Sequence, residues 1–290
     1  MRRRRTLRAA GGCMDDGEIL ELKRKAREIR IMVIDAIGRV GMGHIGGSLS
    51  MVELLTLLYF KVMNIDPADP KRRDRDKLVL SKGHSGPGLY GTLACRGYFP
   101  REWLLTLNKG GTNLPSHCDM NRTPGIDMTT GSLGQGISSA IGIALADRLD
   151  GVKSTVYAII GDGECNEGQV WEAAMAARQF RLDSLVVFLD YNKLQVDGFL
   201  RDIMDVEDIT SKWNAFGWYV QRTNGHVFRE MESAIRRAQG KRGRPSIIVI
   251  DTIKGKDADF AEGKPENHNM VFDHKLAERA IEKLKAMPIE

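Results

Sequence analysis

The chemistry that this sequence could perform is clearest where an apolar run, residues 155–160, ends abruptly at Gly161-Asp162-Gly163. Six residues that favour strands predict one buried strand, and the two glycines let the backbone turn sharply and a ligand approach closely. A helix is expected directly afterwards, and its unpaired N–H groups and positive dipole end would favour a phosphate. The pattern predicts a phosphate-binding turn that carries one carboxylate, Asp162.

A second polar residue of the same kind follows the next predicted strand. The apolar run 185–189 leads to Asp190 and Asn192, and a strand, helix and strand of this length predict a right-handed crossover in a parallel sheet. Asp162 and Asn192 would then lie at the carboxyl ends of two strands, where open α/β sheets bind ligands. A carboxylate and an amide oxygen suit Mg²⁺, which takes its remaining ligands from phosphates and water. The prediction is a metal-bridged diphosphate site, and the alternative is an ordinary tight turn with a loop asparagine.

These two motifs also resemble a known family. The pattern GDGxxxEG, followed by a strand that ends in DxN, looks like the thiamine diphosphate motif of transketolases. The resemblance implies that Asp162, Asn192 and the backbone carbonyl of Leu194 hold the Mg²⁺ that anchors the diphosphate. Gly161 and Gly163 would contact the cofactor, thiamine diphosphate.

Two further glycine-rich turns match the same family. KLVL is predicted as a short strand that leads into SKGHSGPGLYG, and this turn resembles the transketolase segment SxGHxxxxLY, whose histidine, His84 here, faces the thiamine. DMTTGSLGQG precedes a buried helix and resembles the segment TTGxLGQG, in which Gly131, Ser132 and Leu133 would line the thiazole and the diphosphate. As a bare pattern, these glycines would be weak evidence for a phosphate site.

Four of the six histidines, His44, His84, His117 and His268, lie on predicted loops at positions that match the family. The resemblance implies that His44 and His117 hold the donor ketose near the bond to be broken. His84 and His268 would flank the cofactor and assist proton movement from a sugar hydroxyl. Neutral imidazoles suit a sugar because each can donate to or accept from a hydroxyl. The other two histidines match no family position and are expected to be structural or exposed.

Two charged residues take their predicted roles from the resemblance. Lys254 follows the predicted strand 246–252 and precedes His268 by the spacing that transketolases show between a cofactor-contacting lysine and a substrate-contacting histidine. The alternative for Lys254 is a solvated loop residue. Glu167 lies at a predicted helix start, where the dipole would stabilise a solvated carboxylate. In the family this glutamate lies at the subunit interface and meets the glutamate that activates the cofactor.

The segment after the first histidine departs from the family pattern. Full-length transketolases usually have a proline there, whereas this chain has His44-Ile45-Gly46-Gly47. The departure leaves the metal site unchanged and leaves the donor sugar open. The sequence GMGHIGGSLS is expected to be too glycine-rich for a regular element, and Ser50 and Glu53 are expected to form a capping box that starts the next helix.

Alternating helices and strands predict the fold class. One apolar stripe predicts a helix over residues 18–40, and other helices are expected at 206–216, 228–237 and 273–286, with strands at 218–222 and 246–252. This alternation predicts a doubly wound, mainly parallel α/β sheet with helices on both faces, the thiamine diphosphate-binding fold by resemblance.

Composition excludes several classes of protein. A chain of 290 residues, 42% of them hydrophobic, is long enough for one large domain. Five of the 43 Lys and Arg residues lie in the first ten positions, and the others balance the 38 Asp and Glu, which argues against a nucleic-acid groove. Four cysteines without a CxxC pair predict reduced thiols in the cytoplasm. No apolar run reaches the roughly 18 residues of a membrane span.

The domain organisation follows from how much of the family the resemblance covers. Residues 1–17 are expected to be a disordered Arg-rich leader, with a transit peptide or an RNA-binding arm as alternatives, and residues 18–290 a thiamine diphosphate-binding domain of the transketolase N-terminal type. The family's activating glutamate lies in a separate pyrimidine-binding domain, which these residues do not match.

The resemblance therefore implies the N-terminal subunit of a split transketolase. It would act with a separate C-terminal subunit, in a heterotetramer, and transfer a two-carbon ketol unit from a ketose or its phosphate to an aldose or its phosphate. The alternatives are the alpha subunit of a thiamine-dependent 2-oxo acid dehydrogenase and a non-catalytic, partner-binding paralogue. The identity of the sugars is open at this point.

Overall fold

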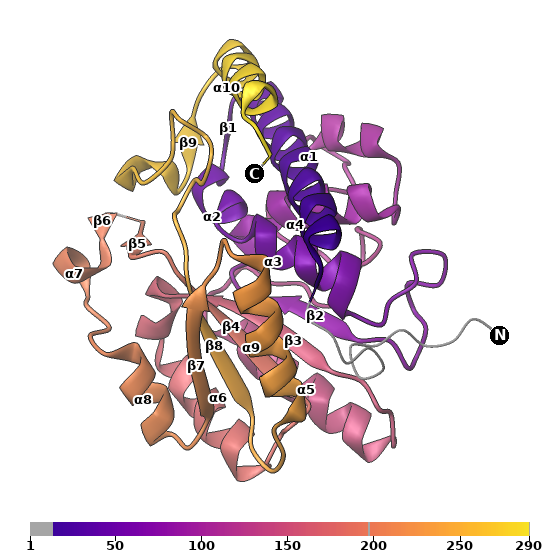
Figure 1. Cartoon of the computed structure of the whole chain (residues 1–290), viewed down its shortest axis with the longest axis vertical. Helices are drawn as coiled ribbons and strands as arrows, with labels where there is room; N and C mark the ends of the chain where they lie inside the picture. Colours follow the sequence, from indigo (N-terminus) through magenta and orange to yellow (C-terminus); the bar gives the residue numbers. More distant parts are fainter. Residues whose placement is uncertain (1–13, 197, 290) are drawn as a thin grey trace.

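A five-stranded parallel sheet forms the centre of the protein (Figure 1), in a computed structural model that describes residues 14–196 and 198–289. The strands lie in the order β2–β3–β4–β8–β7. Their bounds are β2 Lys77–Leu80, β3 Val156–Gly161, β4 Leu185–Tyr191, β8 Ser246–Asp251 and β7 Tyr219–Asn224. This sheet confirms the predicted α/β class.

The direction in which the chain adds strands to the sheet reverses after β4, so that a topological switch point lies between β4 and β8. Strands β2, β3 and β4 follow one another across the sheet, whereas β7 occupies the far edge and β8 returns to lie between β7 and β4. Both β3 and β8 pair with β4 in parallel. The carboxyl ends of β4 and β8 therefore flank the switch point, which is the position where open sheets of this kind bind ligands.

Helices cover both faces of the sheet, because successive strand side chains point to opposite faces. On one face, strand residues such as Tyr157, Phe188 and Ile248 pack in a core with five helices. These are α1 (Asp16–Val40), α3 (Val52–Leu57), α4 (Gly86–Arg96), α9 (Phe228–Gly240) and α10 (His274–Ala286). On the other face, Val187 and Val249 belong to a second core. Its helices are α5 (Gln135–Leu149), α6 (Gly168–Gln179) and α8 (Ile209–Ala215).

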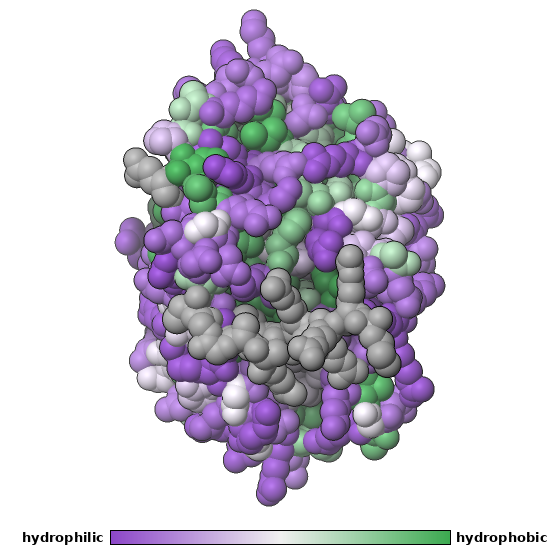
Figure 2. Space-filling model, turned by 45° about the vertical axis from the view of Figure 1, so that its right-hand side comes forward, coloured by the Kyte–Doolittle hydropathy of each residue, from purple (hydrophilic) through white to green (hydrophobic). Residues whose placement is uncertain are grey.

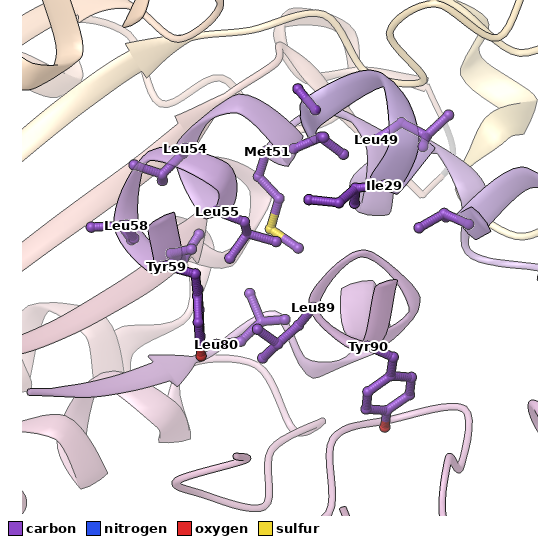
Figure 3. Packing of buried hydrophobic residues seen from close by; sticks show 14 of the residues in the cluster. Ile29, Leu49, Met51, Leu54, Leu55, Leu58, Tyr59, Leu80, Leu89 and Tyr90 are labelled. Atoms are coloured by element: carbon purple, nitrogen blue, oxygen red, sulfur yellow. The ribbon is translucent and has the colours of Figure 1, made fainter. Parts of the chain in front are cut away.

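The first core fixes the loops that carry two of the predicted site histidines. Met51, Leu55, Leu80 and Leu89 lie together in Figure 3 and are at most 2% exposed. Met51 follows the segment of His44, while Leu80 and Leu89 lie on either side of the turn of His84. Burial of such side chains contributes roughly 1.5–3 kcal/mol each, so both turns start from rigid neighbours.

Several short elements complete the chain. They are β1 (Met42–Gly43), which pairs with β9 (Met270–Val271), β5 (Leu194–Gln195), which pairs with β6 (Gly198–Phe199), and the helices α2 (Ile45–Leu49) and α7 (Leu200–Ile203). Short 3₁₀ turns span Gly83–Ser85, Arg101–Thr106, Gly163–Asn166 and Pro265–Asn267, and a π-helical turn, Leu58–Val62, continues α3.

The expectation that GMGHIGGSLS forms no regular element is wrong, because residues 45–49 form the helix α2. Tight packing against neighbouring loops, and not helix propensity, accounts for this helix. A Cβ atom on Gly46 would overlap the side chain of Asn267, and one on Gly47 would lie 2.5 Å from the hydroxyl of Ser85. The glycines therefore allow close approach of neighbouring loops.

The expected capping box at Ser50 and Glu53 is also wrong. Helix α3 begins after Met51, which makes no side-chain cap. The Ser50 hydroxyl lies 2.6 Å from Asp190, and Glu53 binds Arg30 at 2.6 Å, so both side chains have tertiary partners instead. Helix α8 begins at Ile209, later than expected, since the side chain of Asp208 caps it there.

The predicted boundary of the leader is too late. Met14 is 2% exposed, and its N–H donates to Glu232. Asp15 and Glu18 form a capping box at the start of α1. Residues 14–17 are therefore part of the folded domain, and the rest of the predicted leader, residues 1–13, lies outside the described residues.

The surface in Figure 2 is mainly hydrophilic, with hydrophobic side chains in small areas between polar ones. Among the described residues, no helix has both the length and the apolar character needed to cross a membrane. The cysteines within the described ranges, Cys95, Cys118 and Cys165, are free thiols.

Candidate active site

The four predicted site histidines meet at the carboxyl edge of the sheet. His44 precedes α2, His84 lies in the 3₁₀ turn after β2, His117 is in the loop before α5, and His268 follows the last 3₁₀ turn. The ring centroid of His44 lies 5.3 Å from that of His84, 5.4 Å from that of His117 and 5.2 Å from that of His268. The structure thus brings together residues from four separate loops.

All four imidazoles are neutral near pH 7. Burial lowers the pKa of His44 to about 4, and the charges of His117 and Lys254 contribute. Burial and Lys254 lower the pKa of His268 to about 3. Burial lowers the pKa of His84 further still, and it lowers the pKa of His117, which is the most exposed of the four. Each neutral ring offers one donor and one acceptor, as hydroxyl recognition requires.

Asn267 links three segments of this cluster. Its side-chain nitrogen donates to the carbonyl of Lys254 at 3.1 Å and to that of Ala261 at 2.8 Å. Its side-chain oxygen is buried without a partner and faces Gly46. The loops of His44, Lys254 and His268 therefore pack directly on one another.

The predicted metal residues lie at adjacent strand ends. Asp162 is 2% exposed, and its carboxylate accepts the N–H of Gly163 at 2.8 Å and the N–H of Lys193 at 2.5 Å. Asn192 accepts the N–H of Leu194 at 3.1 Å through its side-chain oxygen and donates to Asp190 at 3.2 Å through its side-chain nitrogen. The chain between β4 and β5 therefore folds back onto the GDG turn.

The surroundings of Asp162 fit a divalent cation. Burial raises the pKa of Asp162 to about 7, and the charge of Asp190 adds to this. Backbone N–H groups hold its carboxylate, and no ion pair to it is found within the described ranges. A bound cation would supply the missing positive charge.

The oxygen atoms that the protein offers as metal ligands around Asp162 are few, but they are suitable for a divalent cation. The carboxylate of Asp162, the side-chain oxygen of Asn192 and the carbonyl oxygen of Leu194 form a set of hard oxygen atoms, which suits Mg²⁺. The described residues contain no group of three or more His, Cys, Asp or Glu side chains that could hold a metal. An ion at this position would therefore take further ligands from phosphates and water.

Lys254 is buried beside this site. It is 3% exposed, and its ammonium donates to the carbonyl of Leu194 at 3.3 Å. Burial lowers the pKa of Lys254 to about 8. The alternative of a solvated loop lysine is wrong, since the side chain turns inward to the loop after β4. The Leu194 carbonyl keeps a second lone pair for another ligand.

The loop of Gly131, Ser132 and Leu133 lies against the histidines. The hydroxyl of Thr130 donates to the carbonyl of Leu80 at 2.6 Å, which ties the loop to the end of β2. A Cβ atom on Gly131 would lie 3.2 Å from the ring of His117. The loop therefore approaches the cluster with its backbone.

Glu164 was not predicted as a site residue, although it is the best-connected acid of the GDG turn. It is 2% exposed, and its carboxylate accepts the hydroxyl of Ser81, the N–H of Gly134 at 2.8 Å and the N–H of Gly161 at 3.0 Å. Burial raises the pKa of Glu164 in spite of these bonds. One side chain thus joins all three glycine-rich turns, and its place directly after GDG is the only signal in the sequence.

Asp190 and Lys82 were also missed. Their side chains are 0% and 3% exposed and form an ion pair beneath the site. Burial acts to raise the pKa of Asp190, but the Lys82 ammonium and the hydroxyls of Ser50 and Thr252 hold it below its usual value. The sequence shows them only as the D of DxN and the K of SKGH.

Glu167 lies at the start of α6 and is exposed. It makes no side-chain capping bond to its own helix. This exposure leaves the carboxylate accessible to another chain.

The two remaining histidines are structural, as expected. His226 lies 3.1 Å from Glu53 through Nδ1 and accepts the N–H of Ile253 at 2.9 Å through Nε2. His274 lies 2.9 Å from Asp35. Neither belongs to the cluster.

Comparison with known proteins identifies the family. Residues 22–287 match the family model described as "Transketolase, thiamine diphosphate binding domain". The chain belongs to the transketolase family. It is thus an enzyme of the transketolase type, and this confirms the predicted family and its cofactor, thiamine diphosphate. The match favours this family over the alternative of a 2-oxo acid dehydrogenase alpha subunit.

Two relatives have nearly the same extent as this chain. The "6-deoxy-6-sulfo-D-fructose transketolase subunit SqwG" of Clostridium sp. (strain MSTE9) is 53% identical over 92% of this chain and 97% of the relative. An apulose-4-phosphate transketolase subunit of Actinobacillus succinogenes is 42% identical over 91% of this chain and 96% of the relative.

Solved transketolases have the same fold in a longer chain. The transketolase of Leishmania mexicana superimposes with a TM-score of 0.82 at 27% identity, over 91% of this chain and 45% of that chain. The enzyme of Campylobacter jejuni gives a TM-score of 0.84 at 27% identity, over 93% and 44%. The chain therefore spans less than half the length of these transketolases.

Proposed function

We propose that this chain is the diphosphate- and metal-binding subunit of a split transketolase. With a separate C-terminal subunit that carries the pyrimidine-binding domain, it transfers a two-carbon ketol unit from a ketose to an aldose, using thiamine diphosphate and Mg²⁺. The observation that carries the proposal is that four neutral histidines from separate loops cluster at the carboxyl edge of the sheet, the edge that also carries the GDG turn. The two relatives of matching extent support it, because both are named transketolase subunits.

The cofactor would be held by residues at the switch point. Asp162, Asn192 and the carbonyl of Leu194 would bind Mg²⁺, and the other contacts would come from the surrounding turns. The proposed cofactor-contacting residues are Gly161, Gly163, Gly131, Ser132, Leu133, Lys254 and His84. When bound, thiamine diphosphate supplies an electron sink for the two-carbon unit.

The histidines would then act on the sugar. His44 and His117 would orient the donor by hydrogen bonds from and to its hydroxyls, and such orientation lowers the barrier by fixing the reacting atoms. The rings of His84 and His268 lie 4.8 Å apart. This pair would receive the proton that a sugar hydroxyl releases as the carbon–carbon bond breaks, and return it to the acceptor. The low pKa values support neutral rings in the resting state.

The partner subunit would approach at the exposed start of α6. Glu167 would meet the activating glutamate of the pyrimidine-binding domain there, in a heterotetramer. Free cysteines, two of them buried, support a reducing compartment such as the cytoplasm.

The donor would be a ketose with a terminal anionic group, and we propose a sulfosugar. The 53% identical relative is named for 6-deoxy-6-sulfo-D-fructose and the 42% identical one for apulose 4-phosphate. The test is ketol transfer by the chain reconstituted with its C-terminal subunit, thiamine diphosphate and Mg²⁺, with 6-deoxy-6-sulfofructose, apulose 4-phosphate and fructose 6-phosphate compared as donors. We expect kcat/KM to be at least about tenfold higher for the sulfosugar.

Two results would contradict these proposals separately. Full ketol transfer by the isolated chain would contradict the split enzyme. Equal kcat/KM for all donors would contradict the sulfosugar assignment and leave the split enzyme standing.

A further inference from the structure

One buried carboxylate accepts hydrogen bonds from four side chains beneath the proposed site. Asp190, near the end of β4, is 0% exposed. Its Oδ2 lies 2.6 Å from the hydroxyl of Ser50 and 3.2 Å from the side-chain nitrogen of Asn192, and it also accepts the ammonium of Lys82. Its Oδ1 accepts the hydroxyl of Thr252.

Each donor belongs to a segment that carries a proposed site residue. The donors and the site residues near them in sequence are Ser50 with His44, Lys82 with His84, Thr252 with Lys254, and Asn192 itself. The contact with Thr252 crosses the switch point, because β4 and β8 are the neighbouring strands on its two sides. A single side chain therefore touches all four segments.

Lys82 extends the same connection. It is buried, and its ammonium donates to the carbonyl of Gly47 at 3.0 Å as well as to Asp190. Asp190 and Lys82 neutralise each other in an interior where either charge alone would be strongly destabilising. Their pairing thus holds the turn of His84 against the segment after His44.

The contact with Asn192 has a specific chemical consequence. An ionised carboxylate only accepts hydrogen bonds, so the amide of Asn192 must turn its nitrogen towards Asp190. The amide oxygen then points to the other side, where it accepts the N–H of Leu194 at 3.1 Å. That oxygen is the atom which a magnesium ion requires.

We propose that Asp190 is a positioning residue for cofactor binding: its carboxylate, paired with Lys82, orients the Asn192 amide and aligns the segments of His44, His84 and Lys254. The proposal deepens the proposed function and rests on it through the metal role of Asn192. Outer partners of metal ligands act in this way in other metal sites, where they fix the ligand's orientation.

The experiment must separate positioning from folding. Asp190→Asn alone leaves the Lys82 ammonium buried and unpaired, so it would lower stability for an unrelated reason. The double variant Asp190→Asn with Lys82→Met removes both charges at similar volume, which relieves that penalty. It does not restore the orientation of Asn192, because an asparagine at 190 presents a donor as well as an acceptor.

A matched control removes another ion pair at the opposite edge of the sheet. Lys77, at the start of β2, lies 2.6 Å from Asp147, and both side chains are 15% exposed. Lys77→Met with Asp147→Asn therefore perturbs stability without touching the carboxyl edge.

The readouts on the full chain are thermal unfolding and calorimetric titration with thiamine diphosphate at saturating Mg²⁺. We expect the Asp190/Lys82 double variant to fold and to bind the cofactor about 10- to 100-fold more weakly than wild type. The Lys77/Asp147 control should bind with wild-type affinity.

Three outcomes decide the inference. Wild-type affinity in a folded Asp190/Lys82 double variant would overturn it and leave the proposed function intact. If the wild-type chain itself failed to bind the cofactor, both would fall. If the double variant did not fold, Ser50→Ala with Thr252→Val would replace it, since this pair removes two donors and keeps both charges. We expect at least about tenfold weaker cofactor binding from it, and unchanged affinity would overturn the inference.

Discussion

The rings of His84 and His268 lie 4.8 Å apart between centroids and are tilted by 45° to each other. One follows β2 at one edge of the sheet, and the other follows β8, which lies beside the strand at the opposite edge. Both have a lowered pKa, chiefly because they are buried and because Lys82 and Lys254 lie near them. The pair is therefore neutral at physiological pH.

This neutrality predicts how stability depends on pH. The pKa of His84 is lower in the folded chain than its ordinary value near 6.5, so the unfolded chain binds more protons below about pH 6.5. Stability is then lost as the pH falls through that value. Urea unfolding at pH 7.5 and 5.5 should show a smaller loss for His84→Gln than for wild type. His274→Gln, outside the cluster, is the control, and equal losses in all three proteins would refute the prediction.

Asp162→Ala should abolish Mg²⁺-dependent binding of thiamine diphosphate. The buried carboxylate is the only acidic side chain in the proposed ligand set, and alanine leaves no charged ligand for the ion. Calorimetric titration with and without Mg²⁺ measures this. Asp150→Ala, at an exposed ion pair with Arg73, should bind as wild type does. Unchanged binding by Asp162→Ala would move the metal elsewhere.

His117→Ala should impair donor turnover more than cofactor affinity. His117 is the most exposed ring of the cluster and lies against Gly131 with its edge, which suits contact with the sugar. We expect kcat/KM for the donor to fall about 100-fold in the reconstituted enzyme, with the dissociation constant of thiamine diphosphate unchanged. His274 contacts Asp35 on α1, outside the cluster, so His274→Ala serves as the control. The opposite ranking of the two effects would remove His117 from the substrate site.

Glu167→Ala should affect only the enzyme assembled with its partner. The exposed side chain makes no capping bond to α6, so the isolated chain should keep its stability and its cofactor affinity. Ketol transfer by the reconstituted pair should fall by at least about tenfold. Glu172→Ala, exposed on the same helix, should leave transfer unchanged. Equal activity of the two variants would argue against a partner-facing role for Glu167.

Local patterns were sufficient to predict much of the fold and the position of Asp162 and Asn192 at strand ends. Residues 155–160 and 185–189 are continuous runs that favour strands, so their strands and the crossover between them follow from the length of the runs and their spacing. Parallel strands have their carboxyl ends at the same edge of a sheet, which places Asp162 near Asn192 without any knowledge of the other strands. The four histidines were brought together by resemblance to a family, since no spacing in the sequence joins them.

What escaped prediction depends on contacts between distant segments. Asp190 contacts Thr252 only because β8 returns to lie beside β4, and Ser50 and Lys82 reach it from distant segments, none of which a local pattern predicts. Ser50 and Glu53 have the spacing of a capping box, but their side chains bind Asp190 and Arg30 instead. Residues 45–49 form a helix in spite of two glycines, because close packing against Asn267 and Ser85 outweighs propensity.

We propose that Asp162, Asn192 and the Leu194 carbonyl hold one divalent ion at the carboxyl edge of the sheet. The most direct measurement is anomalous diffraction from crystals grown with Mn²⁺ in place of Mg²⁺ and with thiamine diphosphate. We expect an anomalous peak within about 2.3 Å of those three oxygen atoms, next to the diphosphate. A peak at another site, or a bound diphosphate with no peak beside Asp162, would contradict it.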